Sequence, residues 1–297
     1  MTPPLPCVLI GGWLGAGKTT LVNQLLRQAN GRRLAVLVND FGDQGIDADL
    51  ITGASGEVLE LAGGCVCCSY GADLIGTLRR VTARDPRPDA LLLETSGVAD
   101  PAAVARSIGL LPEIALDGTV VLADAPRLAA LQADPYVGDT VRAQLAAADL
   151  LVLNKVDNVE PAVRAALHRT LPPARTVETV QAALPIECVL GLAISSAGDK
   201  PAARGLRVPT AADGRFVSRS QRLDGPQDPA LLAQRLTAAG SGVLRAKGLL
   251  TDLEGRRVLL QVVGTHAQLA PAPADATGPD RLAVIGLAGL YDGAPWS

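Results

Sequence analysis

One eight-residue segment, Gly12–Thr19, constrains the fold of this chain more than any other. It follows the apolar run Cys7–Ile10, which predicts a strand, and it opens a helical pattern over Thr20–Gln28. Its glycines let the backbone turn so that successive N–H groups point at phosphate oxygens beside a helix N-terminus. We therefore predict a phosphate-binding loop in which Lys18 contacts the β- and γ-phosphates and the Thr19 hydroxyl binds Mg²⁺. The predicted nucleotide contacts in and beside this loop are Gly12, Gly15, Ala16, Gly17, Lys18, Thr19 and Thr20.

The remainder of the first two hundred residues alternates short apolar runs with helical patterns. Nearly continuous apolar runs are typical of parallel strands that are covered on both faces, so we predict an α/β fold with a doubly wound, mostly parallel sheet. The further predicted strands are Leu34–Val38, Ala90–Leu93, Thr119–Leu122, Leu150–Leu153 and Cys188–Leu192. The further predicted helices are Gly71–Arg84, Pro101–Leu110, Thr140–Ala147 and Pro161–Leu171, and Asp100 is expected to cap the second of them.

A stretch rich in Gly, Pro, Ala and Asp separates this first domain, residues 1–197, from a second one. We interpret residues 198–214 as a linker and residues 215–297 as a smaller α+β domain. Its predicted elements are a helix over Asp228–Ala238, strands over Arg215–Leu223, Gly242–Asp252, Arg256–Val263 and Arg281–Ile285, and a loop over Pro271–Pro279.

Composition excludes several classes of protein. The net charge of −3 over 297 residues gives no electrostatic basis for nucleic-acid binding. The chain has no apolar run long enough to cross a membrane and no N-terminal pattern of a signal peptide, so we expect a cytoplasmic protein with reduced thiols.

A second nucleotide element is predicted after the strand Leu150–Leu153. The carboxylate of Asp157 can accept hydrogen bonds from N1–H and the 2-amino group of guanine, a pair of donors that adenine lacks. Asn154 and Lys155 would hold this loop beside the base. We expect Ser195–Ala197, after the last predicted strand, to approach the base from the other side.

The most unusual segment of the sequence contains Cys65, Cys67 and Cys68. Three thiolates on a glycine-led turn can converge on one soft cation, which favours Zn²⁺ and also fits Co²⁺ or Ni²⁺. The alternatives are buried structural cysteines or a redox-active thiol pair. Cys7 and Cys188 are expected to be core residues.

Two acidic segments follow predicted strands at the same edge of the sheet. Asp40 and Asp43 come after the second strand, and Glu94 comes directly after the third. We expect Glu94 to serve Mg²⁺ or its water and the Gly97 N–H to sense the γ-phosphate, although acids at such positions also cap turns. The group that orients the attacking water stays open among Asp40, Asp43 and a backbone group.

These motifs occur in the order found in the CobW-like GTPases, a family of the SIMIBI class that the sequence resembles. The shared segments are the phosphate loop, Asn39–Asp47, Cys65–Cys68, Glu94–Pro101 and Asn154–Asp157, and in the second domain Leu244–Gly248 and Arg281–Gly286. The resemblance implies a slow GTPase, cycling between GTP and GDP with Mg²⁺, that binds zinc or a related ion and delivers it to a client metalloprotein. It also implies a nucleotide-dependent homodimer, and it places Asp40 in a loop linked to metal and nucleotide.

The sequence departs from the family pattern at three points: Asp40 replaces a glutamate, Gly64 replaces an asparagine, and a histidine-rich stretch is missing. These differences concern the identity of the metal rather than the nucleotide. Three other functions stay open. They are an ATP-dependent kinase or transporter subunit, a GTPase activator of a cobalt-, nickel- or iron-dependent enzyme, and a redox regulator without stoichiometric metal.

Overall fold

The structure of the chain is a computed structural model that describes residues 3–38, 56–60, 72–171, 175–190, 215–238, 240–272, 276 and 278–291. The chain divides into two compact units, Met1–Leu184 and Pro185–Ser297. The predicted domain boundary at residue 197 and the predicted linker over 198–214 lie outside the described residues.

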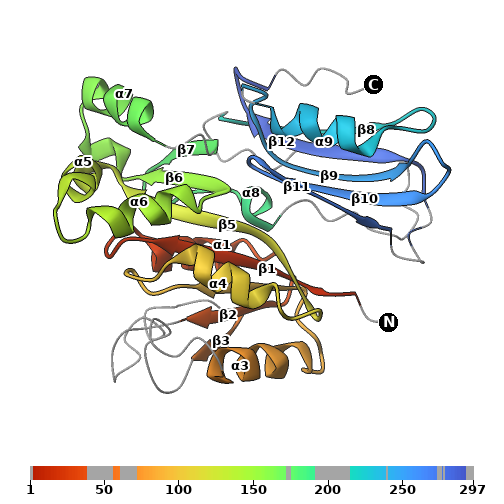
Figure 1. The fold of residues 1–297 in the computed structure, drawn as a ribbon, viewed down its shortest axis with the longest axis horizontal. Helices are drawn as coiled ribbons and strands as arrows, with labels where there is room; N and C mark the ends of the chain where they lie inside the picture. Colours follow the sequence, from red (N-terminus) through yellow and green to blue (C-terminus); the bar gives the residue numbers. More distant parts are fainter. Residues whose placement is uncertain are drawn as a thin grey trace. The chain divides into compact units, whose positions relative to one another are not determined.

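The first unit is built on a seven-stranded sheet in which every described strand pair is parallel (Figure 1). The strand order is β3-β2-β4-β1-β5-β6-β7, so the chain starts near the middle of the sheet and winds outward in both directions. The strands are β1 (Leu5–Gly12), β2 (Leu34–Val38), β3 (Gly56–Glu60), β4 (Ala90–Glu94), β5 (Ile114–Asp124), β6 (Leu150–Asn154) and β7 (Arg175–Thr179).

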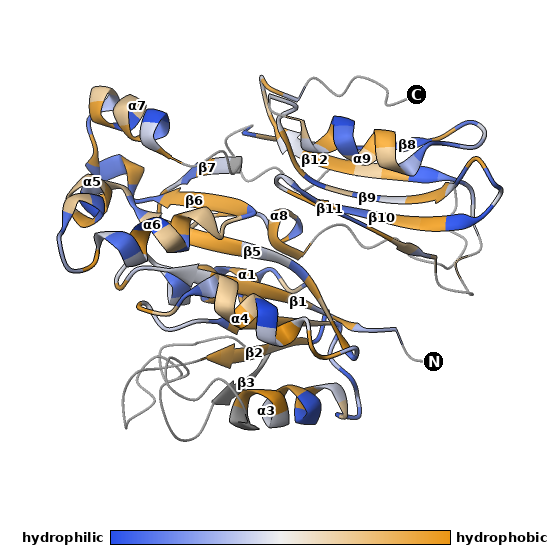
Figure 2. Ribbon diagram, in the orientation of Figure 1, coloured by the Kyte–Doolittle hydropathy of each residue, from blue (hydrophilic) through white to orange (hydrophobic). Residues whose placement is uncertain are grey.

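Helices cover both faces of this sheet because its central strands are apolar on both sides, as the orange strands of Figure 2 show. One face packs against α3 and α4 over β1, β2 and β4, and against α5, α6 and α7 over β5 and β6. The opposite face of β1 and β4 contacts α1. These helices are α1 (Lys18–Arg27), α3 (Ala72–Thr82), α4 (Pro101–Ile108), α5 (Ala125–Ala133), α6 (Gly138–Ala146) and α7 (Pro161–Thr170).

The sequence signal at the start of α4 has the expected geometry. The Asp100 carboxylate accepts a hydrogen bond from the Ala102 N–H at 2.9 Å, and Pro101 occupies the first helical position. Proline is favoured there because its missing N–H would have had no helical partner.

The predicted fold class is confirmed, but one predicted strand is wrong. Cys188–Leu192 was expected to end the sheet, whereas Ile186–Leu190 forms the short helix α8 and β7 is the last strand of the sheet. A short apolar run cannot be distinguished from a buried helical turn by periodicity alone. The strands β3 and β7 were not predicted, because Gly56–Glu60 and Arg175–Thr179 are too polar to read as buried strands. The helix α5 was not predicted either.

The second unit contains a five-stranded antiparallel sheet in the order β11-β10-β9-β12-β8. One face packs against α9 (Pro229–Thr237) through a core that includes Leu232, Leu236 and Leu250. The strands are β8 (Phe216–Arg222), β9 (Val243–Thr251), β10 (Arg257–Val263), β11 (His266–Pro271) and β12 (Arg281–Leu287).

Four of these strands and α9 match the predicted elements, whereas β11 was not predicted. The chain turns tightly between β10 and β11, with Gly264 in the left-handed region at φ 54°, and the first residue of β11 is His266. Strand β11 is a largely exposed edge strand with little apolar alternation, which explains why its sequence gave no strand pattern.

The described helices include none that is both long enough and apolar enough to span a membrane.

Candidate functional site

The candidate site lies at the carboxyl edge of the first sheet. Parallel strands end at the same edge, so the loops that follow β1, β4, β5 and β6 meet there. The glycine-rich loop follows β1 and leads into α1, as the sequence predicted.

The phosphate loop is tightly wound against its neighbours. Gly17 caps α1 with φ 104°, and a Cβ atom at this position would lie 2.5 Å from Nδ2 of Asn154, so only glycine fits. The Lys18 side chain is buried, and its Nζ lies 3.5 Å from the carbonyl oxygen of Trp13. The loop therefore holds its lysine at the helix N-terminus, where backbone N–H groups favour an anion.

An acidic group from β4 meets the phosphate loop. The Thr19 hydroxyl donates a hydrogen bond to Oε1 of Glu94 at 3.1 Å, and Glu94 is only 2% exposed. A hydroxyl and a buried carboxylate are the hard oxygen donors that Mg²⁺ prefers. The predicted pair of Mg²⁺ ligands, Thr19 and Glu94, is thus brought together by two elements 75 residues apart in sequence.

Asn154 connects three segments of the site. Its Nδ2 donates to the Ala16 carbonyl at 2.9 Å, and its Oδ1 accepts from the Thr179 hydroxyl at 3.1 Å and from the Ala182 N–H at 2.8 Å. The phosphate loop, the end of β6 and the segment after β7 are therefore fixed to one another by one buried amide.

The next residues of this motif are arranged around a buried carboxylate. Lys155 adopts the left-handed conformation with φ 62°, and its Nζ pairs with Oδ2 of Asp124 at 2.8 Å. Asp124 ends β5 and is 4% exposed. Asp157, the predicted contact to the base, lies in the 3₁₀ helix η1 (Val156–Asn158) with its side chain exposed.

Comparison with known proteins places these motifs in a family. The model of the CobW/HypB/UreG nucleotide-binding domain matches residues 6–180, and that of the cobalamin synthesis protein cobW C-terminal domain matches residues 216–290. The chain belongs to the CobW/HypB/UreG family. As a member of this family, it is a P-loop GTPase related to metallochaperones.

The matches to individual proteins differ in how much of the chain they cover. The chain is 30% identical over 331 residues to the zinc chaperone CobW of a Sinorhizobium species, covering 97% of this chain and 93% of that protein. It is 32% identical over 178 residues to the zinc-regulated GTPase metalloprotein activator 1 of Schizosaccharomyces pombe, covering 57% of this chain and 43% of that protein. Among solved structures, the zinc(II)-bound YjiA GTPase from E. coli matches with 21% identity and a TM-score of 0.45, covering 97% of this chain and 95% of that chain.

Sequence reasoning missed part of this CobW/HypB/UreG site. Ser195–Ala197 was expected beside the base, after a strand at Cys188–Leu192. The structure has the helix α8 at Ile186–Leu190 instead of that strand, and residues 195–197 lie outside the described residues, so their predicted role stays a prediction. The segment that contacts Asn154 is Thr179–Ala182, which begins at the last residue of β7. Had β7 been recognised, its position next to β6 would have identified this segment.

Two further site residues carried no motif signal. Asp124 lies two residues beyond the predicted strand Thr119–Leu122 and was given no role, although its carboxylate pairs with Lys155. Gln144 of α6 donates from Nε2 to the carbonyls of Gly97 and Ala99, at 3.0 and 2.9 Å. Gly97, the predicted γ-phosphate sensor, is thereby fixed from a helix that no sequence motif connected with the nucleotide.

The predicted transition-metal ligands of this CobW/HypB/UreG chain, Cys65, Cys67, Cys68 and Asp40, lie outside the described residues, as does Asp43. The segments that the structure does describe contain no group of three or more His, Cys, Asp or Glu side chains that could hold a metal.

The other two cysteines are core residues, as predicted. Cys7 in β1 and Cys188 in α8 are fully buried, and burial raises the pKa of both thiols far above the usual range. Neighbouring carboxylates, Asp117 for Cys7 and Glu187 for Cys188, raise the two pKa values further. Both groups stay protonated at neutral pH and are unsuited to metal binding.

Proposed function

We propose that this GTPase binds one transition-metal ion, preferably Zn²⁺, at Cys65, Cys67 and Cys68. It releases the ion to a client metalloprotein, and the release depends on whether GTP or GDP is bound. The observation that carries this proposal is the direction of β2 and β3. Both strands run parallel to β1, so they end at the sheet edge where the phosphate loop lies.

The chain leaves β2 at Val38 and β3 at Glu60, on that edge. The segment that follows β2 carries Asp40, and the segment that follows β3 carries the three thiols before α3 begins at Ala72. The chain therefore leaves β3 toward the thiols at the same edge of the sheet from which the nucleotide loops depart. This is the connectivity expected of a protein in which nucleotide and metal affect each other's affinity.

Within this proposal the nucleotide is GTP or GDP with Mg²⁺. Lys18, Gly12–Thr20 and Gly97 would contact its phosphates, and Thr19 and Glu94 would hold Mg²⁺, which neutralises the charge that develops on the phosphates. Asp157 would select guanine, with Asn154 and Lys155 holding its loop. The distance of 3.1 Å between the Thr19 hydroxyl oxygen and Oε1 of Glu94 supports the assignment of both oxygens to one ion.

The zinc chaperones among the relatives motivate the choice of Zn²⁺, and the second unit is where we place client recognition. Dimerisation that depends on the nucleotide remains part of the same proposal. A cytoplasmic site of action fits the chemistry, because thiols that exchange a metal must stay reduced.

The decisive experiment measures metal affinity by competition with a chromophoric chelator. The apoprotein is titrated with Zn²⁺, Co²⁺ and Ni²⁺ in the presence of GDP or of a non-hydrolysable GTP analogue. Cys67→Ala is compared with Cys188→Ala, a matched control that removes a buried thiol from the second unit. We expect tight binding that Cys67→Ala weakens at least about tenfold, that Cys188→Ala leaves unchanged, and that differs between the nucleotides.

Each alternative function predicts a different result. If the protein binds Co²⁺ or Ni²⁺ more tightly relative to Zn²⁺ than the usual ranking of divalent metals predicts, an activator of a cobalt or nickel enzyme is favoured. Metal binding indifferent to Cys67 would leave the thiols as structural or redox groups. Equal affinities with GDP and the GTP analogue would contradict the coupling.

A further inference from the structure

Gln144 is the most deeply buried polar side chain of α6. It is 1% exposed on a helix whose Val141 and Leu145 pack into the apolar core over β5 and β6. Burying an amide in such surroundings is unfavourable unless its polar atoms are hydrogen-bonded, and a leucine or methionine would pack there without that cost. The presence of glutamine therefore calls for a specific partner.

That partner is the loop between β4 and α4. Gln144 Nε2 donates to the carbonyl oxygens of Gly97 and Ala99, at 3.0 and 2.9 Å. Two carbonyl acceptors at hydrogen-bond distance fix the orientation of the amide, because its oxygen could not replace the NH₂ group there. Gln144 thus holds both ends of the three-residue segment Gly97–Ala99.

The other side of this segment lies against the phosphate loop. A Cβ atom on Gly97 would lie 2.5 Å from Cδ2 and 2.9 Å from the backbone nitrogen of Leu14, so the two backbones are in close contact. Residues Gly97–Ala99 are consequently enclosed between Leu14 of the phosphate loop and Gln144 of α6. Any movement of Gly97 toward or away from a phosphate must alter both contacts.

The current arrangement leaves two polar atoms of this region unsatisfied. Oε1 of Gln144 and Oγ of Ser96 are buried and have no hydrogen-bond partner among the described residues. Buried groups of this kind are rare, and they destabilise the conformation that contains them. A rearrangement of the loop that supplied hydrogen-bond partners to these two atoms would remove this destabilisation. A second arrangement of the loop would therefore be favoured by these contacts.

We propose that Gln144 is a positioning residue of the GTPase: it sets the position of Gly97–Ala99 and transmits the presence of the γ-phosphate from that loop to α6. Gain of the γ-phosphate contact at Gly97 rearranges the two hydrogen bonds of Gln144, and loss of the contact restores them. The inference rests on the nucleotide site proposed above, and it is independent of the metal site.

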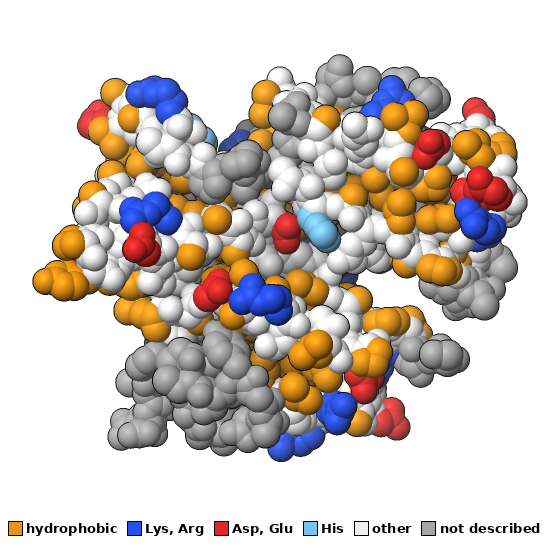
Figure 3. Space-filling view, viewed as in Figure 1, with side chains coloured by type: hydrophobic (Ala, Val, Ile, Leu, Met, Phe, Trp, Pro, Cys, Tyr) orange, Lys and Arg blue, Asp and Glu red, His pale blue; other side chains and the backbone are white. Residues whose placement is uncertain are grey.

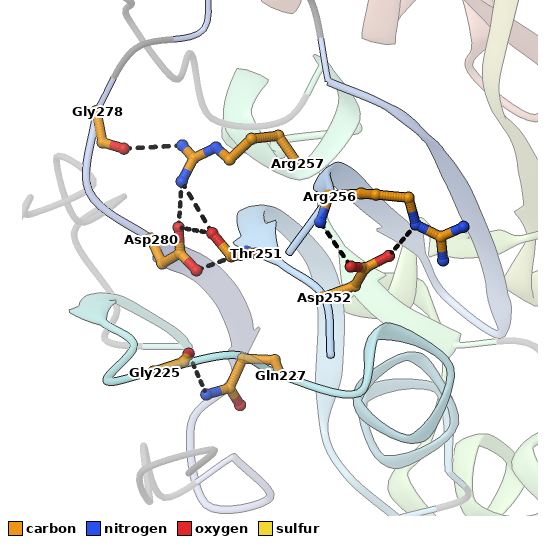
Figure 4. Close-up of polar contacts among 8 residues, drawn as sticks. All are labelled: Gly225, Gln227, Thr251, Asp252, Arg256, Arg257, Gly278 and Asp280. Atoms are coloured by element: carbon orange, nitrogen blue, oxygen red, sulfur yellow. Dashed lines mark hydrogen bonds and ion pairs between the residues drawn. The ribbon is translucent and has the colours of Figure 1, made fainter. Parts of the chain in front are cut away.

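The test compares Gln144→Met, which conserves volume without a donor, with Gln144→Glu, which has the same shape with an oxygen facing the two carbonyls. The matched control is Gln227→Leu. Gln227 of the second unit also donates from Nε2 to two backbone carbonyls, those of Asp224 and Gly225, at 3.2 and 3.1 Å (Figure 4 draws the bond to Gly225). Affinities for GDP and for a non-hydrolysable GTP analogue, kcat and KM are measured for each protein.

We expect Gln144→Met to change the ratio of the two affinities by about tenfold, the effect of losing two neutral hydrogen bonds in one state only. GDP binding should change less than GTP-analogue binding, and Gln227→Leu should leave the ratio at its wild-type value. For Gln144→Glu the ratio should return toward the wild-type value as the pH is lowered, because a protonated carboxyl can again donate to a carbonyl. A purely structural role does not predict this pH dependence.

An unchanged ratio in Gln144→Met and Gln144→Glu at every pH would overturn the inference, even if both variants were less stable. Should Gln144→Met fail to fold, the pH series of Gln144→Glu decides alone. Failure of the wild-type protein to bind GTP would overturn the nucleotide site as well, whereas normal binding with unchanged ratios would remove only the role of Gln144.

Discussion

The buried polar side chains of the nucleotide site and that of Asp252 in the second unit make contacts of different range. In the first unit they join segments that are far apart in the sequence: Asn154 to Ala16 across 138 residues, Thr19 to Glu94 across 75, and Lys155 to Asp124 across 31. In the second unit the buried carboxylate of Asp252 bonds to the N–H and guanidinium of Arg256, four residues away. The buried guanidinium of Arg245 in the same unit makes a long-range contact, to the Val189 carbonyl 56 residues away, so Asp252 is the local case. Long-range contacts assemble a site from several loops, whereas local contacts of this kind fix one turn.

Several charged side chains of the second unit pair around the β9–β10 turn, and Figure 4 shows Arg256 with Asp252 and Arg257 with Asp280. Arg256 also pairs with Glu254 at 2.8 Å, and Arg257 pairs with Asp280 and donates to the Gly278 carbonyl. Beside this turn lies a hollow of about 480 Å³ whose lining includes the exposed side chains of Leu253 and Leu269. Figure 3 shows hydrophobic side chains gathered over this part of the second unit.

The comparison indicates where substitutions affect chemistry and where they affect only stability. A polar residue that joins distant loops should alter nucleotide binding more than folding, because the ligand depends on the relative position of those loops. A polar residue that closes a local turn should alter folding alone.

Lys18→Ala should give the largest effect. The ammonium group is buried at the N-terminus of α1, so removing it takes away the predicted lysine contact to the β- and γ-phosphates and should lower kcat/KM for GTP by about 10³-fold or more. Phosphate release under saturating GTP and thermal unfolding are measured together. The unfolding temperature should stay near that of the wild type, and residual activity above about a tenth would contradict the assignment.

Asp157→Asn should give the next largest effect, on base selection. The exposed carboxylate is predicted to accept two hydrogen bonds from guanine, and an amide can accept with only one of its two atoms. We expect GTP affinity to fall by about 10²-fold while xanthosine triphosphate gains affinity, because its base presents an acceptor where guanine has a donor. Competition with a fluorescent nucleotide measures both, and parallel losses for the two nucleotides would refute base contact by Asp157.

The phosphate and base loops were predictable because glycines, Lys18, Asn154 and Asp157 stand at fixed spacings after apolar strands. Sequence patterns of this kind reflect local geometry, such as the positive φ of Gly17. The central strands were predictable for the same reason, since burial on both faces leaves continuous apolar runs. The outer strands β3 and β7 have mixed composition and gain their stability from neighbours, which no local pattern records.

Asp124 and Gln144 could not be found from sequence because their roles depend on tertiary contacts. Asp124 ends an apolar strand and reads as an ordinary helix start, and Gln144 occurs in a helix with no unusual pattern. Only the packing of α6 beside the β4–α4 loop, and of β5 beside β6, gives these side chains their partners. The strand predicted at Cys188–Leu192 was wrong for a similar reason, because a short buried apolar run occurs both in strands and in short helices.

Asp124→Asn should have an intermediate effect. The charge-assisted pair with Lys155 Nζ at 2.8 Å would become a neutral contact, and Lys155 would lose the group that holds it beside the base. We expect nucleotide affinity to fall about tenfold, with equal losses for GTP and GDP because the base is common to both. Isothermal titration with each nucleotide measures this. A loss confined to GTP would show that Asp124 acts on the γ-phosphate instead.

Asp252→Asn should have the smallest effect on activity and a distinct effect on stability. Burial acts to raise the pKa of Asp252, but hydrogen bonds from the backbone and guanidinium of Arg256 outweigh it and hold the pKa below its usual 3.8. A carboxyl whose pKa is lower in the folded state contributes stability above the unfolded pKa and loses it as the pH falls through the folded value. The wild type should therefore unfold at a higher temperature than Asp252→Asn at pH 7, and the difference should shrink below about pH 4. GTP hydrolysis should be equal in the two proteins at pH 7. Altered hydrolysis would mean that this local turn reaches the nucleotide site, and the distinction between local and long-range polar contacts would fail for this molecule.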